Sequence, residues 1–402
     1  MWFDMKTFIR MSLMREKEAI NEHLSEFTGV ILDAHILETF QNASSGYISN
    51  NKLRYILDPN TYRLAIDPII DCTDKRWYDR IIQNFKIQDL INDQGLLDTT
   101  LLRDHKRLER FVIDILRYQE DRISNLSGDI ESWLFLLEES NEDENQKPYC
   151  VIPPYFIIDS EELLDLNIEA INLSLDKSEL PIYANIPIYY DNLFNENVIN
   201  HIIKRYIETD ADGFLLWVTD YNEVKERSIS LQCYQSLFKE MKELAGSQRE
   251  VINLFGGFFS TILASKNIYD GLAHGIGISE SRNPYGLGGP APTLYYVPIL
   301  HRMLTSERAD DLILTVKSRC SCPVCSSKMP SELKTMELVR HILNVKMIEQ
   351  REIEPLSMDE IIAKLDQDYE MIYRSAGDTR TQRTFMAYSQ QLKEWVNSLK
   401  VL

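Results

Sequence analysis

Three cysteines and one histidine in the C-terminal part of the chain have the types and spacing of a metal site. Cys320, Cys322 and Cys325 fall within six residues, and His341 follows after fifteen intervening positions in a predicted helix. Thiolate sulfur and imidazole nitrogen are ligands that tetrahedral Zn²⁺ takes in closed, structural sites. His341 is the only histidine after Cys325. The pattern predicts a structural zinc site, and the alternative is three incidental buried cysteines.

Acidic residues at the ends of predicted strands form a second group that could do chemistry. Asp58 follows the apolar run Leu53–Leu57, and Asp220 comes two residues after Gly213–Val218. Carboxylates at the strand ends of an α/β barrel can act as general acids, bases or nucleophiles. The alternatives are that Asp58 starts an Asp-Pro turn and that Asp220 caps a helix.

One further strand end combines several chemically active side chains. His274, Gly275, Glu280 and Arg282 lead into a glycine-rich stretch at 285–290. The combination is typical of a loop on a catalytic face that closes over substrate. The alternative is a histidine whose hydrogen bonds are satisfied inside the fold, followed by a long glycine connection.

The elements that must position these residues alternate between buried strands and amphipathic helices. The predicted strands are Thr7–Leu13, Gly29–Leu37, Leu53–Leu57, Cys150–Ile158, Leu180–Ile188, Gly213–Val218, Val251–Phe255, Gly271–Ile278 and Leu294–Val297. The predicted helices between them include Arg15–Ser25, Glu161–Leu173, Glu196–Thr209, Ser228–Leu244 and Thr305–Val316. This alternation indicates βαβ units with a parallel sheet, and about eight units favour a (β/α)₈ TIM-type barrel.

Residues 75–147 interrupt this alternation and are predicted to form a helical insertion. The remaining divisions are the first barrel strands in 1–74, the rest of the barrel in 148–316, and a zinc-binding, helical subdomain in 317–402. The insertion carries the densest basic cluster of the chain, which is Arg103, Lys106, Arg107, Arg110 and Arg117. This cluster could contact nucleic-acid phosphates, and the alternative is a helix covered in ordinary ion pairs.

Composition limits the classes of protein and of partner. The chain has 402 residues with 43 basic and 62 acidic side chains, giving a net charge of −19, which excludes a basic body for nucleic-acid binding. No apolar run reaches membrane-spanning length, and the N-terminus lacks the features of a secretion signal. We therefore expect a cytoplasmic protein without membrane contact, whose helical tail packs on the barrel or mediates a homodimer.

Four segments occur in an order that resembles the tRNA-guanine transglycosylase superfamily. They are Ala211–Asp220, Leu254–Gly257, Tyr269–Gly277 and the cysteine–histidine group, with a weaker match at Tyr55–Pro59. The resemblance implies a zinc-bearing TIM barrel that exchanges a guanine base for a 7-deazaguanine in nucleic acid. Members that modify DNA are expected to be nearer than those that modify tRNA.

The resemblance also implies roles for single residues. Asp58 matches the general base or nucleophile, Asp220 the aspartate that binds the base edge, and Gly256 and Gly257 the backbone that a flat base approaches. His274, Gly275 and Glu280 would line the same pocket.

Two departures from the family pattern bear on this function. Phe258-Phe259-Ser260 stands where a glutamine is expected, and Tyr295–Arg302 stands where the family has a Phe-Asp-Cys nucleophile motif. Either Asp58 replaces the nucleophile, or the chain has lost exchange chemistry. The alternative function is an inactive or repurposed barrel that binds a nucleobase or a partner protein, and a partner subunit could supply the missing positive charge.

Overall fold

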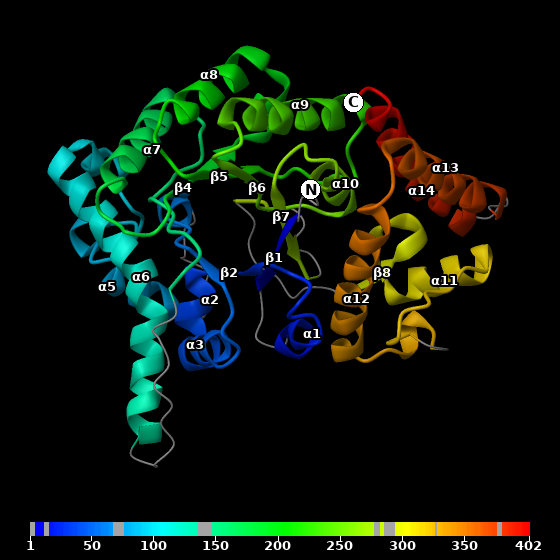
Figure 1. Cartoon of the computed structure of the whole chain (residues 1–402), viewed down its shortest axis with the longest axis horizontal. Helices are drawn as coiled ribbons and strands as arrows, with labels where there is room; N and C mark the ends of the chain where they lie inside the picture. Colours follow the sequence, from blue (N-terminus) through cyan, green and yellow to red (C-terminus); the bar gives the residue numbers. More distant parts are fainter. Residues whose placement is uncertain are drawn as a thin grey trace.

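The protein is a mixed α/β structure built on a curled parallel sheet (Figure 1). The computed structural model describes residues 5–11, 16–66, 76–135, 147–276, 282–284, 294–325, 328–375 and 380–402. The sheet strands are β1 Lys6–Met11, β2 Gly29–Asp33, β3 Tyr55–Asp58, β4 Tyr183–Ile188, β5 Gly213–Val218, β6 Glu250–Asn253 and β7 Gly271–Gly275.

The seven strands follow the order β3-β2-β1-β7-β6-β5-β4, and every neighbouring pair is parallel. The first strand therefore lies beside the last one, as in a barrel whose strands run in sequence order. The parallel, sequential sheet that the barrel prediction required is present over these seven strands.

Helices follow most strands and pack on one face of the sheet. They are α1 Lys17–Asn21, α2 Ala34–Thr39, α3 Gln41–Asn50, α4 Tyr62–Ile66, α5 Arg76–Asn84, α6 His105–Phe135, α7 Glu161–Ser174, α8 Glu196–Ile207, α9 Ser228–Ala245, α10 Phe258–Ser265, α11 Ser306–Val316, α12 Thr335–Ile353, α13 Met358–Ser375 and α14 Arg380–Leu399. Local sequence fixes several helix starts: the side chains of Ser160 and Asn195 accept hydrogen bonds from Leu163 N and Val198 N.

Alternate residues of each strand enter two different cores. Ile9 and Leu32 belong to the large core between the sheet and the helices, whereas Phe8 and Ile31 belong to a smaller core inside the curl of the sheet. This alternation follows from the two-residue period of a strand, and both faces are apolar because both are covered.

The segment 149–158 lies between the two edge strands of the sheet. Tyr149 N donates to Tyr55 O at 2.7 Å on the β3 side, and Val151 and Ile158 form isolated parallel bridges with Ile182 and Ile188 on the β4 side. We predicted a regular strand here, but Pro153 and Pro154 have no backbone N–H to donate to a ladder, so the pairing stays interrupted.

Several predicted boundaries need correction. The strand predicted for Gly29–Leu37 ends at Asp33, because helix α2 begins at Ala34. The helix predicted for Arg15–Ser25 is shorter in the structure, where α1 covers Lys17–Asn21. The strand Leu294–Val297, named β8, lies outside the main sheet and pairs antiparallel with β9 (Arg302–Thr305).

The insertion is helical as predicted, with α5 and α6 and no strand element among its described residues 76–135. Helix α6 packs against α3 and α7, and its far end extends away from the rest of the molecule (Figure 1). No helix in the described ranges is both long and apolar enough to cross a membrane.

The C-terminal helices pack on the same outer face of the sheet as α1, α9 and α10. Helix α12 packs against α1 and α10, and α13 and α14 pair with each other while α14 contacts α9 (Figure 1). Trp395 of α14 is fully buried, and its Nε1 donates to Glu223 O at 3.0 Å. The tail therefore packs on the body of the protein.

Candidate functional site

Four charged side chains meet inside the sheet at the carboxyl ends of β1, β2 and β3. Arg10, Asp33 and Asp58 each stand two positions after an inner-core residue, so all three point into the curl, and Arg282 joins them from the segment after β7. We call these four residues the charged cluster. Arg10, Asp33 and Asp58 are only 2%, 5% and 1% exposed. Burial of this kind requires that each charge has a partner.

The contacts within the charged cluster give each carboxylate different partners. Arg10 Nη1 donates to Asp33 Oδ1, and Arg282 Nη1 donates to Asp33 Oδ2 at 2.7 Å. Both terminal nitrogens of Arg10 lie 3.4 Å from Asp58 Oδ2. Asp58 Oδ1 accepts from the Tyr155 hydroxyl at 2.8 Å and from Asn60 N at 3.0 Å.

These partners shift the pKa values of the two aspartates in opposite directions. Burial raises the pKa of Asp58, and the neighbouring Asp33 charge raises it further, against the opposing effect of Arg10. Burial also acts on Asp33, but the guanidinium groups of Arg282 and Arg10 hold the pKa of Asp33 well below its usual range. Neighbouring carboxyl groups with opposite pKa shifts are typical of acid–base sites.

Aromatic rings border the charged cluster. The Arg10 guanidinium lies 4.4 Å from the centroid of the Phe255 ring, and the Arg282 guanidinium lies 5.7 Å from that of Tyr62. Trp217 contacts both rings, with centroid distances of 5.6 Å to Tyr62 and 5.3 Å to Phe255. Flat faces of this kind can stack against a planar ligand.

His274 lies on the opposite face of the sheet from the charged cluster. It shares its face with Leu272 of the helix-side core, and its Nδ1 lies 3.3 Å from Gly256 O. Burial, together with the Lys346 charge, lowers the pKa of His274 to about 3. The structure therefore does not bring His274 together with Asp58.

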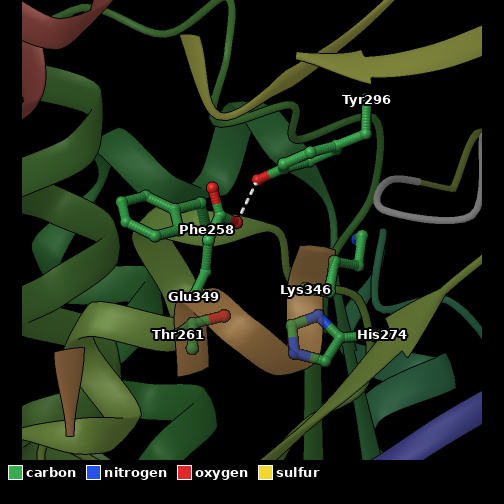
Figure 2. A pocket seen from close by; sticks show the side chains of 6 residues that line it. All are labelled: Phe258, Thr261, His274, Tyr296, Lys346 and Glu349. Atoms are coloured by element: carbon green, nitrogen blue, oxygen red, sulfur yellow. Dashed lines mark hydrogen bonds between the residues drawn. The ribbon is translucent and has the colours of Figure 1, made fainter. Parts of the chain in front are cut away.

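His274 instead lines a small pocket between the sheet and the C-terminal helices (Figure 2). The other lining residues are Phe258, Thr261, Tyr296, Lys346 and Glu349. The Tyr296 hydroxyl donates to Glu349 Oε2 at 2.7 Å, as the dashed line in Figure 2 shows. The pocket is thus lined by side chains of β7, α10, β8 and α12.

The other predicted pocket residues fall in different places. Gly275 is the register partner of Arg10 at the end of β7, next to the charged cluster. Asp220 is exposed, adopts a left-handed backbone with φ of 56°, and its N donates to Arg282 O at 2.9 Å. Glu280 lies outside the described residues.

Gly256 and Gly257 form the tight turn that enters α10. A Cβ atom at Gly256 would lie 2.6 Å from the Cβ of Ser260, so packing alone requires a glycine at this position. Gly257 occupies the N-cap position of α10, and the Glu223 carboxylate accepts from Phe259 N at 2.8 Å in the first turn. The contacts of both glycines are therefore those of a helix start.

The basic residues of the insertion are exposed. Arg110 binds Asp89 with two contacts of 2.8 Å from one nitrogen. Arg103, Lys106 and Arg107 are exposed and have no side-chain ion pair with any described residue. Three cations on one short stretch are thus available to an anionic partner.

The predicted metal ligands come together in space. One ligand atom from each of Cys320, Cys322, Cys325 and His341 lies within 4.8 Å of every other, so this group could hold a metal ion. His341 Nδ1 lies 3.9 Å from Cys320 Sγ, 3.4 Å from Cys322 Sγ and 3.1 Å from Cys325 Sγ.

Residues of β8 orient the histidine of this group. His341 Nε2 lies 2.7 Å from Tyr296 O, so this nitrogen carries the proton and Nδ1 is left as the ligand. The ring of Tyr295 stacks on the imidazole with centroids 4.0 Å apart, and its hydroxyl lies 3.4 Å from Cys325 Sγ. The surrounding residues therefore fix both the tautomer and the plane of the ring.

Comparison with known proteins adds no relative. No protein-family model matches this chain, and no curated protein matches it significantly. We therefore infer the function from the sheet, the charged cluster and the cysteine–histidine group.

Sequence reasoning did not select Asp33, Arg10 or Tyr155 as site residues. Asp33 was not selected because the predicted strand continued past it to Leu37. The available signal was an acidic residue between an apolar run and a helix, which indicates the end of a strand. Arg10 is a charged residue within an otherwise buried strand, which was the available signal. Tyr155 could be found only from the packing of segment 149–158.

We expect the purified protein to contain about one metal equivalent per chain and the Cys322→Ser variant to contain almost none. The substitution removes a thiolate ligand that is 2% exposed, so the α12 region should also lose thermal stability. Elemental analysis and thermal unfolding measure both effects. Cys233→Ser, which changes a free cysteine outside the group, is the matched control and should keep its metal.

A second prediction concerns His301, which is buried between the β8–β9 turn, α12 and α13. His301 Nδ1 lies 2.6 Å from Glu349 Oε1, and Nε2 lies 3.5 Å from Asp368 Oδ2. Burial opposes the charge, but Glu349 and Asp368 together raise the pKa of His301 to about 9. A raised pKa means that the charged imidazole stabilises the folded state below the unfolded pKa of about 6.5.

This stabilisation should disappear as the pH rises from about 6.5 through about 9, with a loss on the order of 3 kcal/mol in the free energy of unfolding. Urea unfolding at several pH values, with metal kept saturating, measures it. His301→Gln should lack this pH-dependent component. Equal pH slopes in the two proteins would contradict the assignment.

Proposed function

We propose that this protein is a base-exchanging glycosyltransferase of nucleic acid, which replaces guanine by a 7-deazaguanine, with DNA expected ahead of tRNA. The observation that carries the proposal is the position of Asp58. It is a buried carboxyl group at the carboxyl end of a parallel strand, held by Tyr155 and Arg10 and bordered by aromatic rings that pack edge to face. The active sites of α/β barrels lie at this end of the strands.

We propose further that segment 149–158 closes the sheet into a complete (β/α)₈ barrel. The support is its hydrogen bonding to both β3 and β4, and the inner-core side chains of Cys150, Ile152 and Ile157. With this segment in the fourth position, the wall has eight members in sequence order.

We propose Zn²⁺ as the metal of the cysteine–histidine group, with a structural role. Tetrahedral zinc with Zn–S of about 2.3 Å and Zn–N of about 2.0–2.1 Å separates sulfur from nitrogen by about 3.6 Å. The distances from His341 Nδ1 to the three sulfur atoms, 3.1 to 3.9 Å, bracket this value. Four protein ligands leave no open coordination position for substrate.

The order of the strands changes where the missing nucleophile should be sought. On the side of β1 away from β2, the neighbouring strand is β7, whereas β8, which comes before β9, α11 and the cysteines, belongs to another sheet. The inward position after Ala273 on β7 is Gly275, which carries no acid. Among the described residues at this edge of the sheet, the inward-facing carboxyl groups are those of Asp33 on β2 and Asp58 on β3, and this supports Asp58 as a catalytic residue.

The chemistry of base exchange fits the surroundings of Asp58. Breaking an N-glycosidic bond leaves positive charge on the sugar and a base that needs a proton. A carboxyl group with a raised pKa can supply that proton, and Phe255 and Trp217 offer faces on which a base can stack.

The second candidate function is a repurposed barrel that binds a nucleobase or a partner protein without catalysis. The observation in its favour is the pairing of two arginines with two aspartates, which satisfies the charged cluster internally. The net charge of −19 also disfavours a polyanionic partner.

Incubation with labelled 7-deazaguanine base and either DNA or tRNA separates the two candidates. We expect incorporation into DNA above that into tRNA, and a loss of about 10²–10⁴-fold in rate for Asp58→Asn, which is the usual contribution of a general acid–base. Asp114→Asn, at a buried aspartate of α6 paired with Lys86, is the control and should retain activity. Failure to label either polymer would favour the binding protein.

The exposed cations of the insertion should contact the phosphates of the substrate. We expect an Arg103/Lys106/Arg107→Gln variant to bind DNA more weakly at all sequences, with a salt slope reduced by about 3 units, because each phosphate contact contributes about 0.9. Binding titrations at several salt concentrations measure the slope.

The matched control is Arg205/Arg227/Lys364→Gln, which removes the same charge from cations that are already paired with Glu161, Glu394 and Glu352. If both triple variants change the slope equally, only net charge matters and the insertion is not the docking surface.

A further inference from the structure

Two aspartates stand side by side at the inner carboxyl end of the sheet. Asp33 of β2 and Asp58 of β3 are register partners, and both contact Arg10 Nη1. Neighbouring strands lie about 4.8 Å apart, which is close to the separation of about 5–5.5 Å between the two carboxyl groups of retaining glycosidases. The pair therefore has the spacing of a nucleophile and an acid–base.

The contacts of the two carboxyl groups differ in a way that assigns these roles. Asp33 accepts from Arg10 on one oxygen and from Arg282 on the other, so its ionised form is favoured. Although Asp33 occupies the N-cap position of α2, its side chain makes no cap hydrogen bond and turns to the arginines instead. Asp58 has only the longer contacts to Arg10, and its other oxygen accepts from Tyr155 and Asn60.

We infer that Asp33 is the nucleophile and Asp58 the general acid–base of a double-displacement glycosyl transfer. This inference rests on the proposed function. It identifies a nucleophile on β2, because the inward position after Ala273 on β7 is Gly275, which has no side chain.

The reaction balances with these two groups alone. An ionised oxygen of Asp33 attacks C1′ of the sugar, the C1′–N9 bond breaks, and its electron pair leaves on the guanine. Asp58 gives its proton to this guanine, and the sugar is held as an ester of Asp33. The incoming 7-deazaguanine then gives its N9 proton to Asp58 and attacks C1′. The ester C–O bond breaks, and its electron pair returns to Asp33.

Arg10 and Arg282 are positioning residues in this scheme. The Arg10 guanidinium lies 4.4 Å from the centroid of the Phe255 ring and reaches both aspartates, and its register partner on β7, Gly275, has no side chain. His35 also lies near, with Nδ1 3.8 Å from Asp33 Oδ2, and burial with the Arg63 charge lowers the pKa of His35 to about 3, so this imidazole stays neutral.

The decisive experiment uses the full-length protein with a labelled guanine-containing oligonucleotide and no incoming base. After acid quenching, peptide mass spectrometry should find the oligonucleotide attached to Asp33. The adduct should be absent from Asp33→Asn and present in Asp114→Asn, and exchange by Asp33→Asn should fall on the order of 10⁴-fold or more. An adduct on Asp58, or full exchange by Asp33→Asn, would overturn the assignment.

A second measurement needs neither substrate nor an active variant. In protein labelled with ¹³C at the aspartate carboxyl carbons, the Asp58 signal should titrate at a higher pH than the Asp33 signal, with the Asn variants giving the assignments. An Asp33 signal that titrates above that of Asp58 would overturn the roles. Absence of base exchange by the native protein, with these titrations as expected, would instead refute the proposed function and leave the acid pair assigned.

Discussion

The pairing of Arg10 with Asp33 and Asp58 is the interaction on which the carboxyl end of the sheet depends. A cation in the middle of a buried strand is tolerated only when carboxylates lie within hydrogen-bond reach, and removal of one partner leaves an uncompensated charge. β2 and β3 supply those carboxylates from the two strands next along the sheet, while Gly275 on the opposite neighbour of β1 carries no side chain. The same interaction brings together two carboxyl groups whose pKa values are shifted in opposite directions.

The C-terminal subdomain is attached to the sheet through helix α12, which contributes residues to three sites. His341 belongs to the cysteine–histidine group that could hold a metal ion, Lys346 lines the pocket of Figure 2, and Glu349 accepts from Tyr296 and binds His301. These positions lie along a single helix that packs on α10 and α1. A metal ion held by this group would therefore stabilise the packing around β7 from the helix side, at a distance from the charged cluster inside the curl.

An acidic protein that acts on a polyanion needs a local concentration of positive charge. The cations of the insertion without ion pairs meet that need on the outside, whereas Arg10 and Arg282 are buried and satisfied by aspartates. Under the proposed function, affinity for the polymer and chemistry at the base would therefore lie in different parts of the chain. This separation is consistent with the net charge of −19.

The sequence by itself determined the ligands of the metal-binding group, the parallel strands, and the helical insertion, because close cysteine spacing and apolar runs between polar breakers are local signals. Only the tertiary structure decided which side chains share a site. His274 is in register with Ile9, Val30 and Tyr55, whereas Asp58 comes three residues after Tyr55, and this odd number of positions puts the two side chains on opposite faces of the sheet. Asp33 and Arg10 meet Asp58 because β1, β2 and β3 are neighbours in register, and the interrupted pairing of segment 149–158 follows from two prolines. Facing and register depend on contacts between residues far apart in the chain, which no local pattern contains.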